Sequence, residues 1–271
     1  MTAISPSAPI RLLAAVFAMA MIASAAVAGD EWPNLRGPRF DGRIEAPGTF
    51  DAEGIGLELA WRIPVGSAYS GIAVADGKAV TMFADGEGNW VAAYDVKTGE
   101  QAWRHRLGDA SKGHDGSDDG PLSSPAIGGG RVHVLTPEGG LVALRLTDGK
   151  ARWEKRIDRD FGAEPPHFGF GTSPLVDGDA LVVQAGGKDG KSIVGFSART
   201  GETVWSHGDD AVSYQSPAMM TLAGQRQIVA ASGKKITGLS ADDGEVLWVH
   251  ELGEDDQTRS TTPTFIGDDR F

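Results

Sequence analysis

The chain has 271 residues, of which 41% are apolar and 23% charged, as is ordinary for a globular protein of one large or two small domains. Its formal net charge is −12 and no cluster of Lys and Arg interrupts this acidity, which argues against binding to nucleic acid or to an anionic membrane surface. The chain has no Cys, which excludes disulfides, thiolate metal sites and Cys nucleophiles.

Residues 1–28 have the pattern of a secretory signal peptide. Arg11 precedes the uncharged run LLAAVFAMAMIASAAVA, which ends in the triplet Ala26-Val27-Ala28. A positive residue, an apolar core and a small-x-small end are the features of such peptides, so cleavage after Ala28 is predicted. The alternative is an uncleaved anchor, because the apolar run is nearly long enough to span a bilayer. Cleavage would give a periplasmic or secreted protein without a membrane span.

Residues 29–56 are expected to form a lead-in segment, and residues 57–271 a series of repeats. Five tryptophans recur at intervals of 42 to 52 residues: Trp61, Trp103, Trp153, Trp205 and Trp248. A second marker alternates with them, as YSGIAV (69–74), SSPAI (123–127), TSPLV (172–176), QSPAM (215–219) and TTPTF (261–265). Two markers in fixed alternation indicate one structural unit used repeatedly.

Each unit divides into four strand-like pieces, which in the third unit read GTSPLVDG, ALVVQAGG, SIVGFSART and ETVWSHG. The pieces are apolar or alternating over four to six residues and end at Gly, Asp or Asn. After the signal peptide, no segment has apolar residues at helical spacing over three turns. The turns KTGE, TDGK, RTGE and DDGE place Gly99, Gly149, Gly201 and Gly244 where a positive φ is expected. The sequence therefore predicts an all-β protein built from antiparallel hairpins.

A four-stranded unit of 40 to 50 residues matches the blade of a β-propeller. One blade cannot bury both of its faces, so successive blades must stack around an axis. Each tryptophan ends an outer strand and is expected to dock in the wedge between two blades. Its burial there would contribute about 3 kcal/mol to the stability of the fold. The repeated tryptophans are therefore predicted to serve packing.

The pattern A-x-D/S-x-x-T/D-G-x-x-x-W, seen for example in AYDVKTGEQAW (93–103), resembles the tryptophan-docking motif of the pyrroloquinoline quinone (PQQ)-like β-propeller repeat family. The stretch EWPNLRGPRFDGR (31–43) is similar to the opening segment of exported members of that family. The resemblance covers residue 57 to the end of the chain and implies a ring of seven or eight blades. About five are expected here, because the last unit ends inside its second strand, so the chain is expected to be a fragment with an incomplete ring.

The candidate ligand-binding residues come from this architecture. Segments that enter the innermost strand of each blade reach the propeller axis on one face, where propellers usually bind ligands. These segments contain Tyr69, Ser123, His167, Phe170, Tyr214 and Arg259. Aromatic and polar side chains at a channel mouth suit a protein, peptide, glycan or small molecule. The alternative is that the same side chains only fill the channel.

No catalytic or metal-binding residues are predicted. The loop HDGSDDG (114–120) resembles the first half of a calcium loop, but Ala126 occupies the position of the final Glu, which favours a solvated loop. His105, His207 and His250 each follow a docking tryptophan and belong to different blades, so a metal triad is not expected. No nucleophile elbow, P-loop or dinucleotide fingerprint is present.

Two functions from different classes follow from the resemblance. The first is an exported non-enzymatic propeller that binds or scaffolds partners, similar to the propeller lipoprotein of outer-membrane β-barrel assembly, although this chain has no Cys to carry a lipid. The alternative is a quinoprotein dehydrogenase that uses PQQ with calcium to oxidise alcohols or sugars. That family has a vicinal cysteine pair beside the quinone, which this chain lacks, so we favour the non-enzymatic function.

Overall fold

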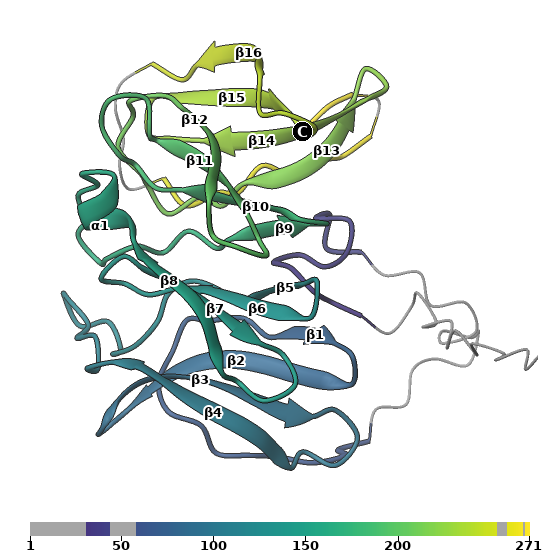
Figure 1. Cartoon of the computed structure of the whole chain (residues 1–271), viewed down its shortest axis with the longest axis vertical. Helices are drawn as coiled ribbons and strands as arrows, with labels where there is room; N and C mark the ends of the chain where they lie inside the picture. The colour runs from purple at the N-terminus through teal and green to yellow at the C-terminus, as the bar shows by residue number, and fades with distance from the viewer. Residues whose placement is uncertain (1–30, 44–57, 254–258, 268) are drawn as a thin grey trace, which may run out of the picture.

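The computed structural model describes residues 31–43, 58–253, 259–267 and 269–271. In these residues sixteen strands form four separate four-stranded sheets, and the one helix is a single turn, α1 (Ile157–Asp160) (Figure 1). The all-β prediction is confirmed. The expected signal peptide, its cleavage after Ala28 and most of the lead-in (29–56) lie outside the described residues. Within the described part of the chain, no helix has the length and apolar character that a membrane span requires.

The strands of each sheet pair antiparallel in sequence order. The first sheet contains β1 (Ala73–Ala75), β2 (Lys78–Asp85), β3 (Gly88–Asp95) and β4 (Gln101–Gly108). The second contains β5 (Ala126–Gly128), β6 (Arg131–Leu135), β7 (Gly140–Arg145) and β8 (Ala151–Arg156). The third contains β9 (Leu175–Asp177), β10 (Ala180–Gln184), β11 (Ile193–Ser197) and β12 (Thr203–His207). The fourth contains β13 (Ala218–Leu222), β14 (Gln225–Ala231), β15 (Lys235–Ser240) and β16 (Val246–Glu251).

The predicted turn glycines lie between the third and fourth strands of each sheet. All four have positive φ, between 67° and 75°, a region in which a Cβ is unfavourable: Gly99, Gly149, Gly201 and Gly244. In each sheet the pairing of the third and fourth strands shifts register close to this turn. The shift lies next to the residue that pairs with the tryptophan. Those facing residues are small: Ala93, Ala143, Gly195 and Gly238. The repeated sequence therefore produces the same hairpin four times.

The four sheets are stacked along the long axis of the molecule, face against face (Figure 1). Each junction buries alternating side chains from two consecutive sheets. Val91 and Val132 share one cluster, Leu141 and Leu181 a second, and the third joins the last two sheets. In the described residues the array is not closed into a ring and contains four complete sheets, which are flanked by parts of further units.

Tryptophan side chains lie across the junctions between sheets. Trp103 in β4 is 7% exposed, and its Nε1 donates to the Leu146 carbonyl of the second sheet over 2.7 Å. A Cβ added to Gly149 would lie 2.5 Å from Cε3 of this ring, so the indole lies directly on the turn glycine. Trp153 repeats both contacts one sheet later, with a 3.1 Å hydrogen bond to the Ala198 carbonyl.

The ends of the array show the same arrangement in part. Trp61 lies outside the named strands, yet its Nε1 donates to the Val96 carbonyl over 2.9 Å and its ring lies on Gly99. Trp205 lies on Gly244 of the fourth sheet. Trp248 Nε1 donates to Gln227 Oε1 of its own sheet over 2.7 Å, and its ring stacks on Phe271 with the ring centroids 5.8 Å apart. The first of these contacts shows that residues before β1 already belong to a repeat unit.

A row of hydroxyl groups joins the sheets at the segments that precede their inner strands. The amide of Ser124 donates to Ser173 Oγ and the amide of Ser173 to Ser216 Oγ, each over 2.9 Å. The amide of Ser216 donates to Thr262 Oγ1 over 3.1 Å. In the first unit the donor is the amide of Gly71, which bonds Ser124 Oγ. These bonds explain why the Ser-Pro marker recurs with the tryptophans.

The lead-in strap, defined here as residues 31–43, crosses the inner strands of the sheets. Trp32 forms an antiparallel bridge with Val74 in β1, and the Pro33 carbonyl accepts from the amide of Ile127 in β5. The Asn34 side chain bonds both the amide and the carbonyl of Val176 in β9, over 3.0 and 3.2 Å. One strap residue thus serves each of three sheets in succession, close to the expected propeller axis.

Candidate functional site

The six predicted ligand-binding residues share one end of the sheets. Five of them lie in segments that precede the inner strands β1, β5, β9 and β13, and Arg259 lies in the corresponding segment before Thr262. The hydroxyl row connects these segments across the sheets. We call this end the loop face and define it by residues 67–72, 109–124, 161–174, 209–217 and 259–262. In Figure 1 it lies on the side of α1, whereas the strap lies on the opposite side.

Burial separates the six residues into two groups. Tyr69 is 52% exposed and the His167 side chain 62% exposed, while Tyr214 and Arg259 are partly buried. Ser123 and Phe170 are fully buried. Their burial fits the alternative that these side chains fill the interior, because Ser123 Oγ donates inward to the Leu135 carbonyl over 2.6 Å. Phe170 belongs to the core between the second and third sheets.

A line of rings connects three loops of the loop face. The His114 and His167 ring centroids are 5.2 Å apart, and the edge of Phe168 meets His167 at 4.8 Å. Phe168 lies 6.0 Å from Tyr214, whose hydroxyl accepts from the Phe168 amide over 3.0 Å. Phe168 is 38% exposed. His114 and Phe168 are missing from the predicted site, although the run PPHFGFG (165–171) could have suggested Phe168.

Acidic side chains fix the loop that carries His114. Asp115 Oδ2 lies 2.8 Å from His167 Nε2, which joins two loops, and the Asp118 amide donates to the Tyr69 hydroxyl over 3.0 Å. Asp119 bonds the Lys112 ammonium and the amide of residue 113, and both interactions lower the pKa of its carboxyl group. The loop that resembles a calcium loop therefore directs two of its carboxylates to protein groups.

A groove of about 420 Å³ runs beside the line of rings. One part of its wall is apolar and consists of prolines and rings: Pro137, Pro165, Pro166, His114, His167 and Phe168. The rest is polar, and there Arg156 forms a bidentate ion pair with Asp158 that lowers the pKa of the Asp158 carboxyl group. Arg156 also donates to the Glu138 carbonyl over 2.8 Å, and Ser111 Oγ donates to the Glu138 carboxylate. The groove presents a rigid surface of rings and prolines with few unpaired charges.

The donor set in the described residues does not fit a calcium site. Calcium takes six to eight oxygen ligands, among them several carboxylates. In the described ranges, no group of three His, Asp or Glu side chains comes close enough to hold a metal ion. His105, His207 and His250 lie in β4, β12 and β16, which confirms that they belong to three different sheets.

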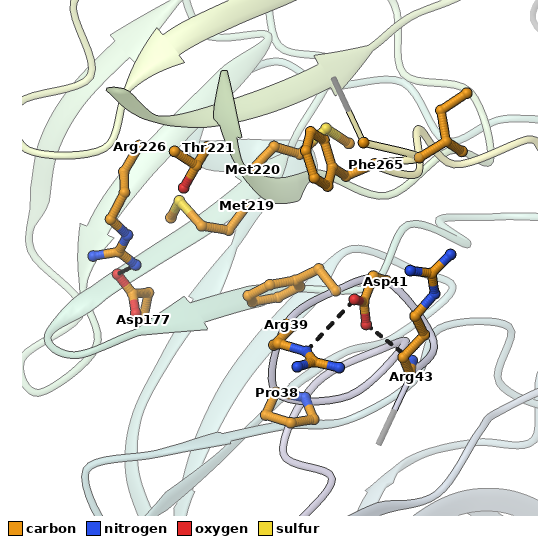
Figure 2. Close-up of a pocket in the computed structure, with 13 residues that line it drawn as sticks. Pro38, Arg39, Asp41, Arg43, Asp177, Met219, Met220, Thr221, Arg226 and Phe265 are labelled. Atoms are coloured by element: carbon orange, nitrogen blue, oxygen red, sulfur yellow. Dashed lines mark hydrogen bonds and ion pairs between the residues drawn. The ribbon is translucent and has the colours of Figure 1, made fainter. Parts of the chain in front are cut away.

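A second hollow, of about 560 Å³, lies between the strap and the fourth sheet. Figure 2 shows Arg39, Asp41 and Arg43 of the strap on one side and Met219, Met220 and Phe265 on the other. The ion pair between Arg226 and Asp177, 2.7 Å long, closes one end. Sequence reasoning missed this hollow, because it depends on where the strap turns.

A family profile described as outer membrane protein assembly factor BamB matches residues 58–169 and 87–269. BamB of Burkholderia pseudomallei is 30% identical over 192 residues, which are 69% of this chain and 44% of that protein. Quinohemoprotein alcohol dehydrogenase ADH IIB of Pseudomonas putida is 27% identical over 229 residues, which are 79% of this chain and 32% of the enzyme. The chain thus spans less than half the length of either relative.

The crystal structure of BamB from Moraxella catarrhalis is similar in fold. It matches with a TM-score of 0.52 and 22% identity, over 74% of this chain and 53% of that one. At this identity the similarity supports a common architecture of repeated four-stranded sheets and nothing more specific.

Proposed function

The chain belongs to the PQQ-like β-propeller repeat family of outer membrane protein assembly factor BamB, and from this membership we propose that it is an exported, non-enzymatic module that binds or scaffolds other proteins. Its place of action would be the periplasm or the cell exterior. The signal-peptide pattern of residues 1–28 supports export. The name of the BamB relatives supports protein partners in outer membrane assembly.

The observation that carries this proposal is the exposed line of rings on the loop face. His114, His167, Phe168 and Tyr214 of this line come from three different loops between sheets, and Tyr69, which precedes β1, lies beside the loop of His114. Hydrogen bonds to Asp115, to the Asp118 amide and to the Phe168 amide hold them in place. Aromatic side chains that are already fixed lose little conformational entropy on binding, and such residues dominate the energetics of protein interfaces. We therefore assign partner binding to the loop face. Arg259 lies there beside Tyr214, because its carbonyl accepts from the Tyr214 amide over 3.0 Å.

The five tryptophans have a supporting role in this proposal. Trp61, Trp103, Trp153 and Trp205 would dock each sheet on the turn glycine of the next and so fix the spacing between loops of the loop face. Trp248, bonded to Gln227 and stacked on Phe271, would instead support the fourth sheet itself. The docking contacts would thus determine the geometry of the binding surface without touching the partner.

The proposal can be tested with an unfolded outer membrane β-barrel protein as the probe. Fluorescence anisotropy of the labelled probe would measure its affinity for the purified full-length chain. Phe168→Ala should weaken binding about thirtyfold, as removal of an interface anchor worth about 2 kcal/mol would do. Val249→Ala is the matched control, because Val249 is 49% exposed on the outer strand β16. Equal affinities for the wild type and both variants would refute binding at the loop face.

A PQQ-dependent dehydrogenase is the second candidate, favoured by the similarity to ADH IIB. It predicts that the purified chain, supplied with PQQ and calcium, reduces a dye in the presence of an alcohol or a sugar. Dye reduction that depends on both additions would replace the proposed binding function with a catalytic one.

A further inference from the structure

The hollow lies at the end of a row of backbone amides on the inner strands, which the strap covers elsewhere. In β1, β5 and β9 the amides of Val74, Ile127 and Val176 all donate to strap residues. Each of these amides points away from the neighbouring strand of its sheet, because it belongs to a pair that makes no ladder hydrogen bonds. The inner strands therefore present a free edge toward the axis, and the strap covers it in the first three sheets.

The fourth sheet has the same edge, and it faces the hollow. Met219 pairs with Ile228 as Val176 pairs with Leu181, so the backbone amide of Met219 also points away from its own sheet. Two residues later, Thr221 occupies the same kind of pair, opposite Arg226. Both Met219 and Thr221 line the hollow.

The strap turns back before it reaches this edge. Gly37 donates to the Asn34 carbonyl over 2.9 Å, and both Arg36 and Gly37 have positive φ, of 65° and 81°. A Cβ on Gly37 would lie 2.7 Å from the Trp32 ring, which packs against the turn. Beyond the turn, Phe40 returns to the core of the fourth sheet. The turn leaves space for an extended segment beside β13.

The charges around the hollow differ in sign from those of the whole chain. Three guanidinium groups and two carboxylates line it, although the chain carries a net charge of −12. Arg226 and Asp177 neutralise each other at 2.7 Å, and Arg39 pairs with Asp41 more loosely, at 3.5 Å. Asp41 also accepts from the Arg43 backbone amide, while the Arg43 side chain is exposed. One positive charge remains to attract a carboxylate.

The opposite wall is apolar and adaptable. Met219 and Met220 contribute two thioether side chains, and Phe265 lies beside them (Figure 2). Ile266 also lines the hollow. Methionine-lined surfaces adjust to apolar groups of different shape. A volume of about 560 Å³ is within the range of pockets that hold a small ligand.

From these features we propose that the hollow binds a short acidic peptide segment in an extended conformation. Its backbone adds to β13 at Met219 and Thr221, as the strap adds to β1 at Val74. One of its carboxylates meets Arg43, and a neighbouring apolar side chain packs on Met219 and Phe265. This site is separate from the loop face, so it does not depend on the function proposed above.

The test uses three five-residue probes with blocked ends, titrated into the full chain by calorimetry. The first alternates Val and Asp, the second has Asn in place of Asp, and the third carries N-methyl groups on the Val amides. We expect the Asp peptide to bind at least tenfold more tightly than either of the others.

Variants of the chain complete the test. Arg43→Glu should weaken the Asp peptide at least tenfold, whereas Lys97→Glu, an equal change of charge on the distant turn of the first sheet, should change the affinity less than twofold. Thr221→Pro removes the amide that faces the hollow without removing a ladder bond to β14, and should weaken the Asp and Asn peptides equally. Equal binding of the Asp and Asn peptides, or no binding at millimolar peptide, would overturn the proposal. The anisotropy assay at the loop face would be unaffected by either result.

Discussion

Gly149→Ala tests whether the tryptophan contacts hold the sheets together. Gly149 has φ of +67°, so a side chain there costs about 1–2 kcal/mol from backbone strain alone. The new Cβ would also lie 2.5 Å from Cε3 and 2.7 Å from Cδ2 of Trp103. The ring would have to move by about 1 Å, because ordinary carbon contacts are about 3.5–4.0 Å. Overpacking of this kind costs about a further 1–3 kcal/mol.

The matched control is Gly130→Ala in the same sheet. Gly130 has φ of +69°, nearly that of Gly149, but nothing lies within 4 Å of the position of its Cβ. The two substitutions therefore share the backbone strain and differ only in the contact with Trp103. We expect urea unfolding, followed by tryptophan fluorescence, to show Gly149→Ala less stable than Gly130→Ala by about 1–3 kcal/mol.

A double-mutant cycle isolates the contact. Trp103→Ala alone should cost about 3–5 kcal/mol, since the buried ring and its hydrogen bond to Leu146 are both lost. In that background Gly149→Ala should cost no more than Gly130→Ala does, because no ring remains to be displaced. Equal costs of Gly149→Ala with and without Trp103 would refute the role given to the tryptophans.

The other changes affect single groups. Asn34→Asp should destabilise the chain by about 1–3 kcal/mol in urea unfolding, because it removes the donor to the buried Val176 carbonyl; an unchanged midpoint would show that the strap contributes nothing there. Burial lowers the pKa of His133 to about 4, so its neutral form is favoured in the folded state. Stability should therefore be complete above pH of about 6.5 and fall by about 3 kcal/mol as pH drops to about 4. His133→Gln should lose less over the same range, and identical pH profiles would contradict this. Ser173→Ala should cost about 1 kcal/mol, because it leaves the Ser124 amide without its acceptor.

Local features of the fold were predictable from the sequence. The turn glycines are determined by their own φ values, and the strands by alternation within a few residues, so Gly149 and its three equivalents were placed correctly. The tryptophans were placed at the ends of repeat units, although their glycine contacts in the following sheet required the structure. The hydroxyl row appeared in the sequence only as a recurring marker, because its bonds join residues more than forty positions apart.

The strap and the details of the loop face were not predictable. Asn34 bonds a residue 142 positions away, and no local pattern indicates such a contact. In the loops that enter the inner strands, the direction of a side chain follows no period. Ser123 and Phe170 are therefore turned inward, while Phe168, only two residues before Phe170, is exposed. The segments that precede the inner strands could be located from the sequence, but the orientation of their side chains required the structure.

The two surfaces lie at opposite ends of the inner strands and have different chemistry. The loop face offers fixed rings that suit a protein surface, whereas the hollow offers free backbone edges and guanidinium groups. A partner bound at the loop face therefore leaves the strap in place beside the hollow. Variants at Phe168 and Arg43 would separate the two activities.

Hydrogen–deuterium exchange of the full chain with and without the unfolded β-barrel probe addresses the proposed function most directly. Binding at the loop face predicts slower exchange in residues 109–122 and 161–171, with no change in the outer strands β4, β8, β12 and β16. Protection confined to the outer strands, or no protection at saturating probe, would contradict the assignment of partner binding to the loop face.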